Sequence, residues 1–152
     1  MQSNKNKTDE NVDIENKRVY LQLLQEPISR MSSTSAIFKG FSSAILAGLA
    51  SASFTEISVW ALLLGLLPIL SFLCLDVYYL SLERKMKYLY RMVVENKKEI
   101  DFSINTRLDK KEIELAKSTP LNCLKSPSIY LFYVPVLACA LILLILKFKD
   151  II

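Results

Sequence analysis

The chain has 152 residues, of which 52% are hydrophobic, and its mean hydropathy is +0.30. It carries 19 Lys and Arg against 15 Asp and Glu, three cysteines without metal-ligand spacing, three glycines and no histidine. The commonest general base and metal ligand is therefore missing, as is a glycine-rich loop that cradles phosphate. This composition argues against an enzyme, a metal site or a bound cofactor, and it favours a membrane protein over a soluble domain.

The N-terminal 35 residues divide into two parts. Residues 1–17 are rich in Asn, Lys, Asp and Glu and predict a disordered tail. Residues 18–35 predict an amphipathic helix, because apolar residues recur at spacings of three and four: Leu21, Leu24, Ile28 and Met31. Pro27 is expected to interrupt or restart this helix, because proline donates no amide hydrogen bond. The helix either lies on the membrane surface or packs against a partner helix, and both alternatives stay open.

Three apolar blocks follow the amphipathic segment. No charged residue interrupts Ile57–Leu75 or Ser128–Leu146, and each block has 19 residues, close to the roughly 20 that a helix needs to cross a bilayer. The first block, Gly40–Thr55, has 16 residues, but residues 35–38 extend it past Lys39. A lysine near a helix end can reach the headgroup region. The three blocks therefore predict three transmembrane helices.

The expected membrane segments are a transmembrane hairpin over residues 36–80 and a third helix over residues 128–147. Residues 81–127 hold eleven Lys and Arg against seven acidic residues, whereas the link around residues 53–58 contains only Glu56. The positive-inside rule then places 81–127 and the N-terminus in the cytoplasm, and the C-terminus in the periplasm or outside the cell.

The cytoplasmic region 81–127 is expected to be mainly helical. No turn signal follows the second membrane helix, so it is predicted to continue beyond the membrane with one packed face: Tyr79, Met86, Leu89 and Val93. Residues 101–106 break this pattern, a short charged helix is predicted from Asp109 to Lys117, and Pro120 and Pro127 bracket a predicted loop. The fold class is an all-α membrane protein: three transmembrane helices, an amphipathic N-terminal helix and a cytoplasmic helical extension, assembled as a homo-oligomeric bundle.

Small residues occupy every fourth position along the first membrane helix and the turns before it: Ser32, Ala36, Gly40, Ala44, Gly48 and Ala52. In lipid, such a row permits two helix backbones to approach closely. The row serves packing within one chain or packing between chains, and the spacing does not distinguish them. A second row of small residues runs beside the first: Ser43, Ala47 and Ser51. The serine hydroxyls on this helix either face a wet axial pore or bond to the helix backbone one turn back.

Asp76 lies near the inner end of the second membrane helix, where a carboxylate is costly unless it is paired or hydrated. Lys39 and Arg30 lie on the preceding antiparallel segment, and Arg84 follows two turns later on the same helix. These three cations are the candidate partners of Asp76. A structural ion pair that fixes the hairpin is favoured over a gate or an ion site, and both alternatives stay open.

The basic cytoplasmic segment either anchors to anionic lipid or holds an anionic ligand such as a nucleotide or an oligonucleotide. Its charges do not have the spacing of a known nucleic-acid motif. The candidate ligand-binding residues are Arg91, Lys97, Lys98, Asp101, Phe102, Ser103, Arg107, Lys110 and Lys111.

Three stretches carry a resemblance to a group of proteins: ISRMSSTSAIFKG (28–40), LDVYYLSLERKMKYLY (75–90) and DFSINT (101–106). They resemble small bacterial inner-membrane proteins of anti-phage defence systems, among them the Hailong-type membrane channel effectors. The resemblance covers about residues 20 to 106, and the matching positions are Arg30, Lys39, Asp76, Tyr78, Tyr79, Glu83, Arg84, Asp101, Phe102 and Ser103. It implies a homo-oligomer in the inner (cytoplasmic) membrane whose opening depolarises the infected cell. It also implies control by a nucleotide or nucleic-acid ligand that a partner enzyme makes.

Two functions remain as hypotheses. The first is an oligomeric inner-membrane ion channel that acts as a defence effector and is gated by a cytoplasmic ligand. The second is a non-conducting membrane anchor or adaptor that recruits a soluble partner enzyme through residues 81–127. The two hypotheses differ in whether the purified protein conducts ions by itself.

Overall fold

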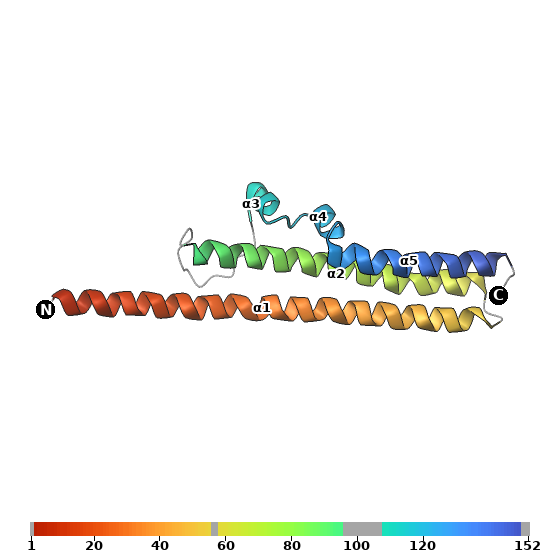
Figure 1. Cartoon of the computed structure of the whole chain (residues 1–152), viewed down its shortest axis with the longest axis horizontal. Coiled ribbons are helices and arrows are strands. Elements are labelled where there is room, and N and C mark those ends of the chain that lie inside the picture. Colours follow the sequence, from red (N-terminus) through yellow and green to blue (C-terminus); the bar gives the residue numbers. More distant parts are fainter. Residues whose placement is uncertain (1, 56–57, 96–107, 150–152) are drawn as a thin grey trace.

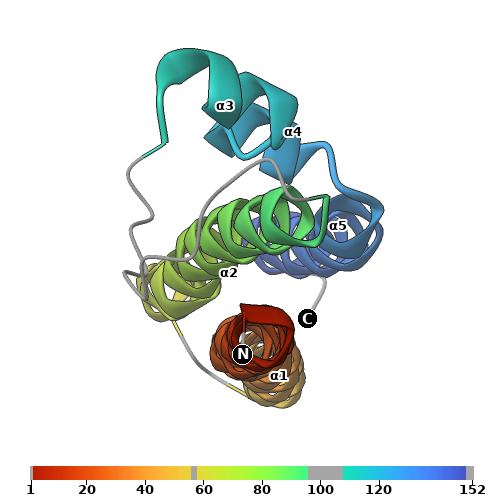
Figure 2. The same ribbon diagram turned by 90° about the vertical axis from the view of Figure 1, so that its left-hand side faces the viewer.

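The computed structural model describes residues 2–55, 58–95 and 108–149, with side chains at residue 12 and from residue 14 onward. In chain order the elements are α1 (Gln2–Ser53), α2 (Val59–Val94), α3 (Lys110–Leu115), α4 (Pro120–Leu124) and α5 (Pro127–Phe148). The long helices α1, α2 and α5 lie side by side along one axis, and α3 and α4 sit beside α2 (Figures 1 and 2). The described part of the chain contains no strand, which confirms the all-α fold class.

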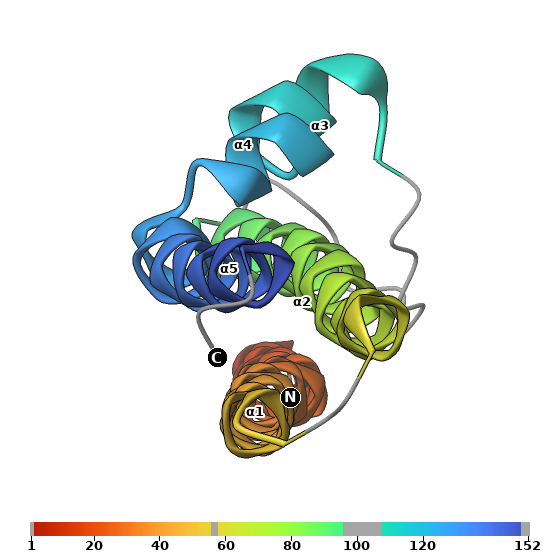
Figure 3. The ribbon, with the colours of Figure 1, turned by 90° about the vertical axis from the view of Figure 1, so that its right-hand side faces the viewer.

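The antiparallel hairpin of α1 and α2 is longer than a bilayer is thick. α1 has 52 residues and α2 has 36, whereas roughly 20 helical residues cross the hydrocarbon core. Both helices project past the start of α5 at the same end of the bundle (Figure 1). We call this the basic end. It comprises residues 14–34 of α1, residues 81–94 of α2 with its C-cap Glu95, and the helices α3 and α4. The opposite end, where α1 turns into α2 and α5 terminates, is the hairpin end (Figure 3).

Apolar residues of α1 and α2 pack against each other along the basic end. Tyr20 and Leu24 of α1 are buried together with Met86, Leu89 and Val93 of α2. Spacings of three and four residues bring these side chains onto the facing sides of the two helices. The amphipathic N-terminal segment therefore packs against a partner helix, and that partner is α2. The packed face predicted on the extension of α2 is confirmed at Met86, Leu89 and Val93.

The N-terminal part differs from the sequence prediction in two respects. Residues 1–17 were predicted to be disordered, but α1 begins at Gln2. A helix propagates readily from a packed segment, and residues 2–16 contain neither glycine nor proline to stop it. Pro27 does not interrupt the helix, because it lies inside α1. Leu24 and Ile28 pack against α2 on either side of Pro27, and this packing offsets the hydrogen bond that proline lacks.

Two short helices connect α2 to α5. The short charged helix predicted over residues 109–117 is confirmed as α3. The predicted loop after it is instead the helix α4, because Thr119 and Ser126 are the N-cap residues of α4 and α5, and Pro120 and Pro127 are their first residues. Proline is favoured at the first position of a helix, where its missing N–H has no partner to lose.

The long helices α1, α2 and α5 each contain a stretch that is long and apolar enough to cross a membrane. Large apolar side chains project outward from α2 and α5: Leu63, Leu64, Leu67, Leu70, Leu131, Val134, Leu141, Ile142 and Ile145. Soluble monomers rarely expose an apolar surface of this extent. Lipid suits it, because helices satisfy their backbone hydrogen bonds internally. The chain therefore has the architecture of a multi-pass membrane protein.

Candidate functional site

A buried ion pair joins α1 and α2 at the level where α5 begins. The Nζ atom of Lys39 lies 3.0 Å from the Oδ2 atom of Asp76. The Asp76 side chain is fully buried, and the Lys39 side chain is 18% exposed. Breaking such a pair leaves an uncompensated charge in a poorly hydrated place. Of the three candidate cations, Lys39 is the one that pairs with Asp76.

The Lys39 ammonium also donates to hydroxyl groups on two helices. Its Nζ atom lies 2.6 Å from the Oγ atom of Ser35, one turn back on α1, and 3.1 Å from the Oγ atom of Ser128 on α5. A lysine ammonium has three donors, and here its three partners come from α1, α2 and α5. We call Ser35, Lys39, Asp76 and Ser128 the charge cluster. It connects all three membrane-spanning helices through one cation.

The side of the charge cluster that points into the bundle is polar and incompletely hydrogen-bonded. Tyr133 of α5 lies beside Asp76 and Ser42, and all three side chains are buried. Ser42 donates to the carbonyl oxygen of Phe38 at 2.9 Å. Among the described residues, the Oδ1 atom of Asp76 and the Tyr133 hydroxyl have no hydrogen-bond partner, whereas Oδ2 has the Lys39 ammonium as its ion-pair partner. Native cores leave few such groups unsatisfied, so these two groups distinguish the site from an ordinary packed core.

Aromatic rings of α1 and α2 contact one another in the turns that carry the ion pair. The Phe38 ring lies 5.7 Å from the Phe72 ring and 5.6 Å from the Tyr79 ring, measured between centroids. Phe72 and Tyr79 lie about one turn before and after Asp76 on α2, and Phe38 directly precedes Lys39 on α1. Aromatic rings bury large apolar areas, so this cluster adds an apolar contact between α1 and α2 in the same turns as the ion pair.

The other two predicted partners of Asp76 lie elsewhere. Arg30 is exposed on α1, and it pairs with no carboxylate in the part of the chain that the structure describes. It precedes Lys39 by nine residues, or about 14 Å along a helix. Arg84 instead donates from Nη1 to the carbonyl oxygens of Lys117 at 2.6 Å and Asn122 at 3.2 Å. Its role is to hold the turn between α3 and α4 against α2.

The row of small residues on α1 faces away from the rest of the chain. Gly40, Ala44 and Gly48 are exposed, and a Cβ atom added at Gly40 or Gly48 would meet no atom within 4 Å. The close approach of α1 and α2 occurs instead at Gly65 of α2, where an added Cβ atom would collide with the side chain of Leu49. Packing within one chain therefore does not account for the positions of Gly40 and Gly48.

Three of the four serine hydroxyls between residues 40 and 53 of α1 bond to the backbone of their own helix. Ser51 donates to the carbonyl oxygen of Ala47 at 3.0 Å, and Ser53 donates to that of Leu49 at 2.7 Å. Ser42 does the same, as described above. This pattern is the backbone alternative considered for these serines. Ser43 differs, because its side chain lines an open apolar groove of about 460 Å³ between α1 and α5.

A second lysine closes the bundle at the hairpin end. The Nζ atom of Lys147 on α5 lies 3.3 Å from the carbonyl oxygen of Ser53 and 2.8 Å from that of Thr55. The last carbonyl groups of a helix have no partner within the helix and carry partial negative charge. Lys147 therefore caps α1, so that lysines link α1 to α5 near both faces of the apolar layer.

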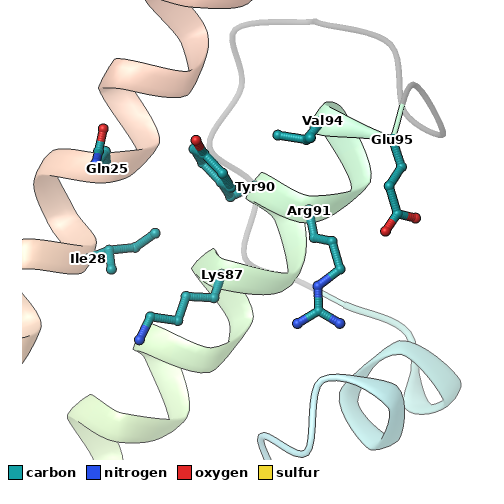
Figure 4. Close-up of a pocket in the computed structure, with 7 residues that line it drawn as sticks. All are labelled: Gln25, Ile28, Lys87, Tyr90, Arg91, Val94 and Glu95. Atoms are coloured by element: carbon teal, nitrogen blue, oxygen red, sulfur yellow. The ribbon is translucent and has the colours of Figure 1, made fainter.

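An open groove of about 520 Å³ lies between α1 and α2 at the basic end, beside their packed side chains (Figure 4). Its lining residues are Gln25, Ile28, Lys87, Tyr90, Arg91, Val94 and Glu95. Figure 4 shows the Lys87 ammonium pointing toward α1 and the Arg91 guanidinium pointing away from it. Lys87 also pairs with Glu83 on the same helix. The groove thus combines two cations and one carboxylate with an aromatic ring and apolar side chains.

The structure describes three of the nine predicted ligand residues. Arg91 lines the groove at the basic end, and Lys110 and Lys111 are exposed at the start of α3. The others lie outside the described residues: Lys97, Lys98, Asp101, Phe102, Ser103 and Arg107. Within the described ranges, no group of three or more Cys, Asp or Glu side chains is placed to hold a metal ion.

Sequence reasoning missed three residues in or beside the charge cluster, of which Ser42 and Tyr133 are buried and Ser128 is exposed. Ser128 and Tyr133 come from the third membrane helix, and Ser42 comes from the first. A hydroxyl-bearing residue near the inner end of an apolar block, at the level of an intramembrane aspartate, is the signal that points to them. The three-helix arrangement was needed to show that they meet.

Comparison with known proteins finds no matching family model, no similar curated protein and no similar solved structure. The class of the protein therefore follows from its own geometry. Three helices long and apolar enough to cross a membrane, two of them joined by a buried ion pair, define a multi-pass α-helical membrane protein.

Proposed function

We propose that the protein is a homo-oligomeric ion channel of the bacterial inner membrane that acts as an anti-phage defence effector. The observation that carries the proposal is the open row of small residues on α1. Gly40, Ala44 and Gly48 are exposed on a membrane helix, and a Cβ atom added at Gly40 or Gly48 would meet no atom of the chain within 4 Å. A row of this kind gains little from lipid but permits close contact with another helix. A second copy of the chain supplies that helix.

The outward faces of the three helices differ in a way that supports α1 as the contact helix. The outward faces of α2 and α5 carry large apolar side chains such as Leu64, Leu67 and Leu131. Between residues 40 and 52 of α1, Phe41 is the one exposed large apolar side chain. Large aliphatic side chains suit lipid and small ones suit helix contacts. In the oligomer, α2 and α5 face lipid and α1 lies at the axis.

The charge cluster fits a role as the gate of this channel. Lys39 attaches α1 to both Asp76 and Ser128, so a displacement of α1 must break or exchange these contacts. α1 and α2 run without interruption from the basic end into the apolar layer. A ligand that changes the packing of Tyr20 and Leu24 on α2 would therefore move the helices at the gate.

The trigger acts at the basic end, which lies in the cytoplasm in this proposal. The net positive charge of residues 81–127 supports both this orientation and an anionic ligand. The groove beside Tyr90 and Arg91 offers an aromatic face and a cation, which suit a nucleotide or an oligonucleotide. The resemblance to anti-phage defence proteins supports a partner enzyme as the source of the ligand.

Substitution in the open row tests the proposal. The purified wild-type protein is expected to form a defined oligomer in native mass spectrometry and to conduct ions in planar bilayers. Gly48→Leu is expected to remove both properties, because its side chain separates the two backbones. Ala138→Leu is the matched control, since Ala138 is exposed on α5 and is expected to face lipid.

Two outcomes would contradict the proposal. One is a wild-type protein that is strictly monomeric and passes no current. The other is a Gly48→Leu variant that conducts as well as the wild type. A protein that never conducts, but protects cells when a soluble partner enzyme is present, would indicate the adaptor alternative.

A further inference from the structure

The segment between α3 and α5 presents exposed leucines beside exposed lysines. Leu115, Leu121 and Leu124 are 70%, 72% and 42% exposed. Lys117 and Lys125 are exposed on the same segment. We call these five residues the α4 patch. Neither the charge cluster nor the open row of α1 includes any of them, so the patch needs an explanation of its own.

The α4 patch is held firmly at the level where α5 enters the apolar layer. Cys123 of α4 is fully buried, in a cluster with Ile129 and Tyr133 of α5 and Val77 of α2. Two residues separate the end of α4 from the first residue of α5. Arg84 fixes the turn before α4 through the two carbonyl groups described above. Figure 1 shows α4 directly beside the beginning of α5.

The surface next to the α4 patch is apolar and is expected to face lipid. Tyr130, Leu131 and Val134 are exposed on the first two turns of α5, which continue from α4. No acidic residue occurs from residue 115 to residue 149, so the lysines of the patch have no counter-charge on this segment. We propose that the α4 patch is an interfacial anchor for an anionic lipid leaflet.

Each part of the patch matches one layer of such a leaflet. Leucines of an interfacial element insert at the boundary of headgroups and acyl chains. Lysines beside them contact the lipid phosphates, and the strength of this contact rises with the anionic fraction of the membrane. A soluble protein partner fits less well, because the core of a protein interface is depleted in lysine. The anchor would fix the depth and rotation of α5, whether or not the protein conducts.

A fluorescent label at Leu121 tests this inference on the full-length protein. Leu121→Cys is made with Cys74→Ala and Cys139→Ala, because those two cysteines are exposed while Cys123 is buried and is left in place. The label is an environment-sensitive fluorophore, and the protein is reconstituted in phosphatidylcholine vesicles with or without phosphatidylglycerol. We expect quenching by lipids that carry a spin label near the headgroup, and little quenching by aqueous iodide.

Val12→Cys is the matched control, since Val12 is an exposed apolar residue of α1. It lies 27 residues before Lys39, or about 40 Å along the helix, and its label is expected to be quenched by iodide and not by the labelled lipid. A Leu121 label that iodide quenches as strongly as the Val12 label would overturn the proposal. So would a Leu121 label that neither reagent reaches, because another protein chain would then cover the patch.

Charge reversal tests the lipid specificity. Phosphatidylglycerol is expected to raise the lipid quenching of the Leu121 label roughly twofold in the wild-type background. The double variant Lys117→Glu/Lys125→Glu is expected to lose this increase and to keep the quenching seen in pure phosphatidylcholine. Lys110→Glu/Lys111→Glu, on α3, is expected to retain the increase. The same increase in all three proteins would contradict a role for the lysines of the patch.

Discussion

Lys39 and Asp76 are desolvated to different degrees, although they form one ion pair. The Asp76 carboxylate is fully buried, whereas the Lys39 side chain is 18% exposed. A lysine can extend its ammonium toward the headgroups while its stem stays in the apolar layer. An aspartate has no comparable reach. The two charges are therefore expected to have different consequences when each is left without its partner.

Lys39→Met is expected to lower the free energy of unfolding by about 3–5 kcal/mol, because it leaves the Asp76 carboxylate buried and uncompensated. Asp76→Asn is expected to cost less, since Lys39 can then turn toward water. The double variant should resemble Asp76→Asn alone. Thermal unfolding in detergent, followed by circular dichroism, measures this order.

Ser71→Ala provides the control for these measurements. Its hydroxyl is exposed and donates to the carbonyl oxygen of Leu67, so its removal should leave the unfolding temperature nearly unchanged. Equal losses in Lys39→Met and Asp76→Asn would show that burial does not distinguish the two charges.

At the scale of elements, α1 and α2 are uninterrupted helices that run from the basic end into the apolar layer. Their packing at the basic end depends on a few buried side chains, of which Leu24 has no exposed surface. α3 and α4 are short, and they are positioned by contacts to α2 and α5. The stability of the basic end therefore depends mainly on the contact between α1 and α2.

Leu24→Ala is expected to destabilise the basic end by about 2–5 kcal/mol, because it opens a cavity in a packed core. Leu23→Ala is the matched control, since Leu23 is the preceding residue of α1 and is 44% exposed. Limited proteolysis of the protein in vesicles should cleave the Leu24→Ala variant faster within the basic end. Equal cleavage rates for the two variants would contradict the packing of α1 on α2.

At the scale of the whole molecule, two glycines have different surroundings: one lies at a helix contact within the chain and the other on an open helix face. Gly65 lies where α2 meets α1 within the chain, and Gly48 lies where the chain leaves α1 open. A large side chain at either position disturbs a helix contact, but only Gly65 belongs to a contact of the isolated chain. Substitution at these two glycines can therefore separate folding from assembly.

Gly65→Leu is expected to lower the unfolding temperature of the protein in detergent, because its side chain collides with Leu49. Gly48→Leu is expected to leave the unfolding temperature of the dissociated protein unchanged while it prevents association. Circular dichroism and native mass spectrometry measure the two effects on the same samples. Loss of fold in Gly48→Leu at monomer concentrations would show that the open row packs within the chain.

Much of the fold was predictable from the sequence, because its signals are local. Apolar blocks of 19 residues fixed the second and third membrane helices, and a periodicity of three and four identified the packed face on α2. The short helix α4 could have been predicted, since Thr119-Pro120 and Ser126-Pro127 each combine an N-cap residue with a proline at the first helical position. The prediction for Pro27 was wrong because the sequence shows only the backbone hydrogen bond that proline lacks. The packing of Leu24 and Ile28 on α2, which offsets that loss, is a contact between helices.

The candidate site was predictable only in part. The sequence identified Asp76 as a costly carboxylate and placed Lys39 within reach of it. By spacing, Arg30 and Arg84 were also plausible partners of Asp76. The packed helices show that Lys39 forms the pair, and that Ser128 of α5 also contacts its ammonium. Tyr133 enters the site from a helix that is more than fifty residues away in the sequence.

The sequence by itself determined that this chain is helical and embedded in a membrane, because helix propensity and hydropathy depend on neighbouring residues along the chain. The tertiary structure decided which cation pairs with Asp76 and which face of α1 stays open. Those outcomes depend on how three helices rotate and shift against one another. Residue spacing defines the faces of a single helix, but it does not define which face of one helix meets another.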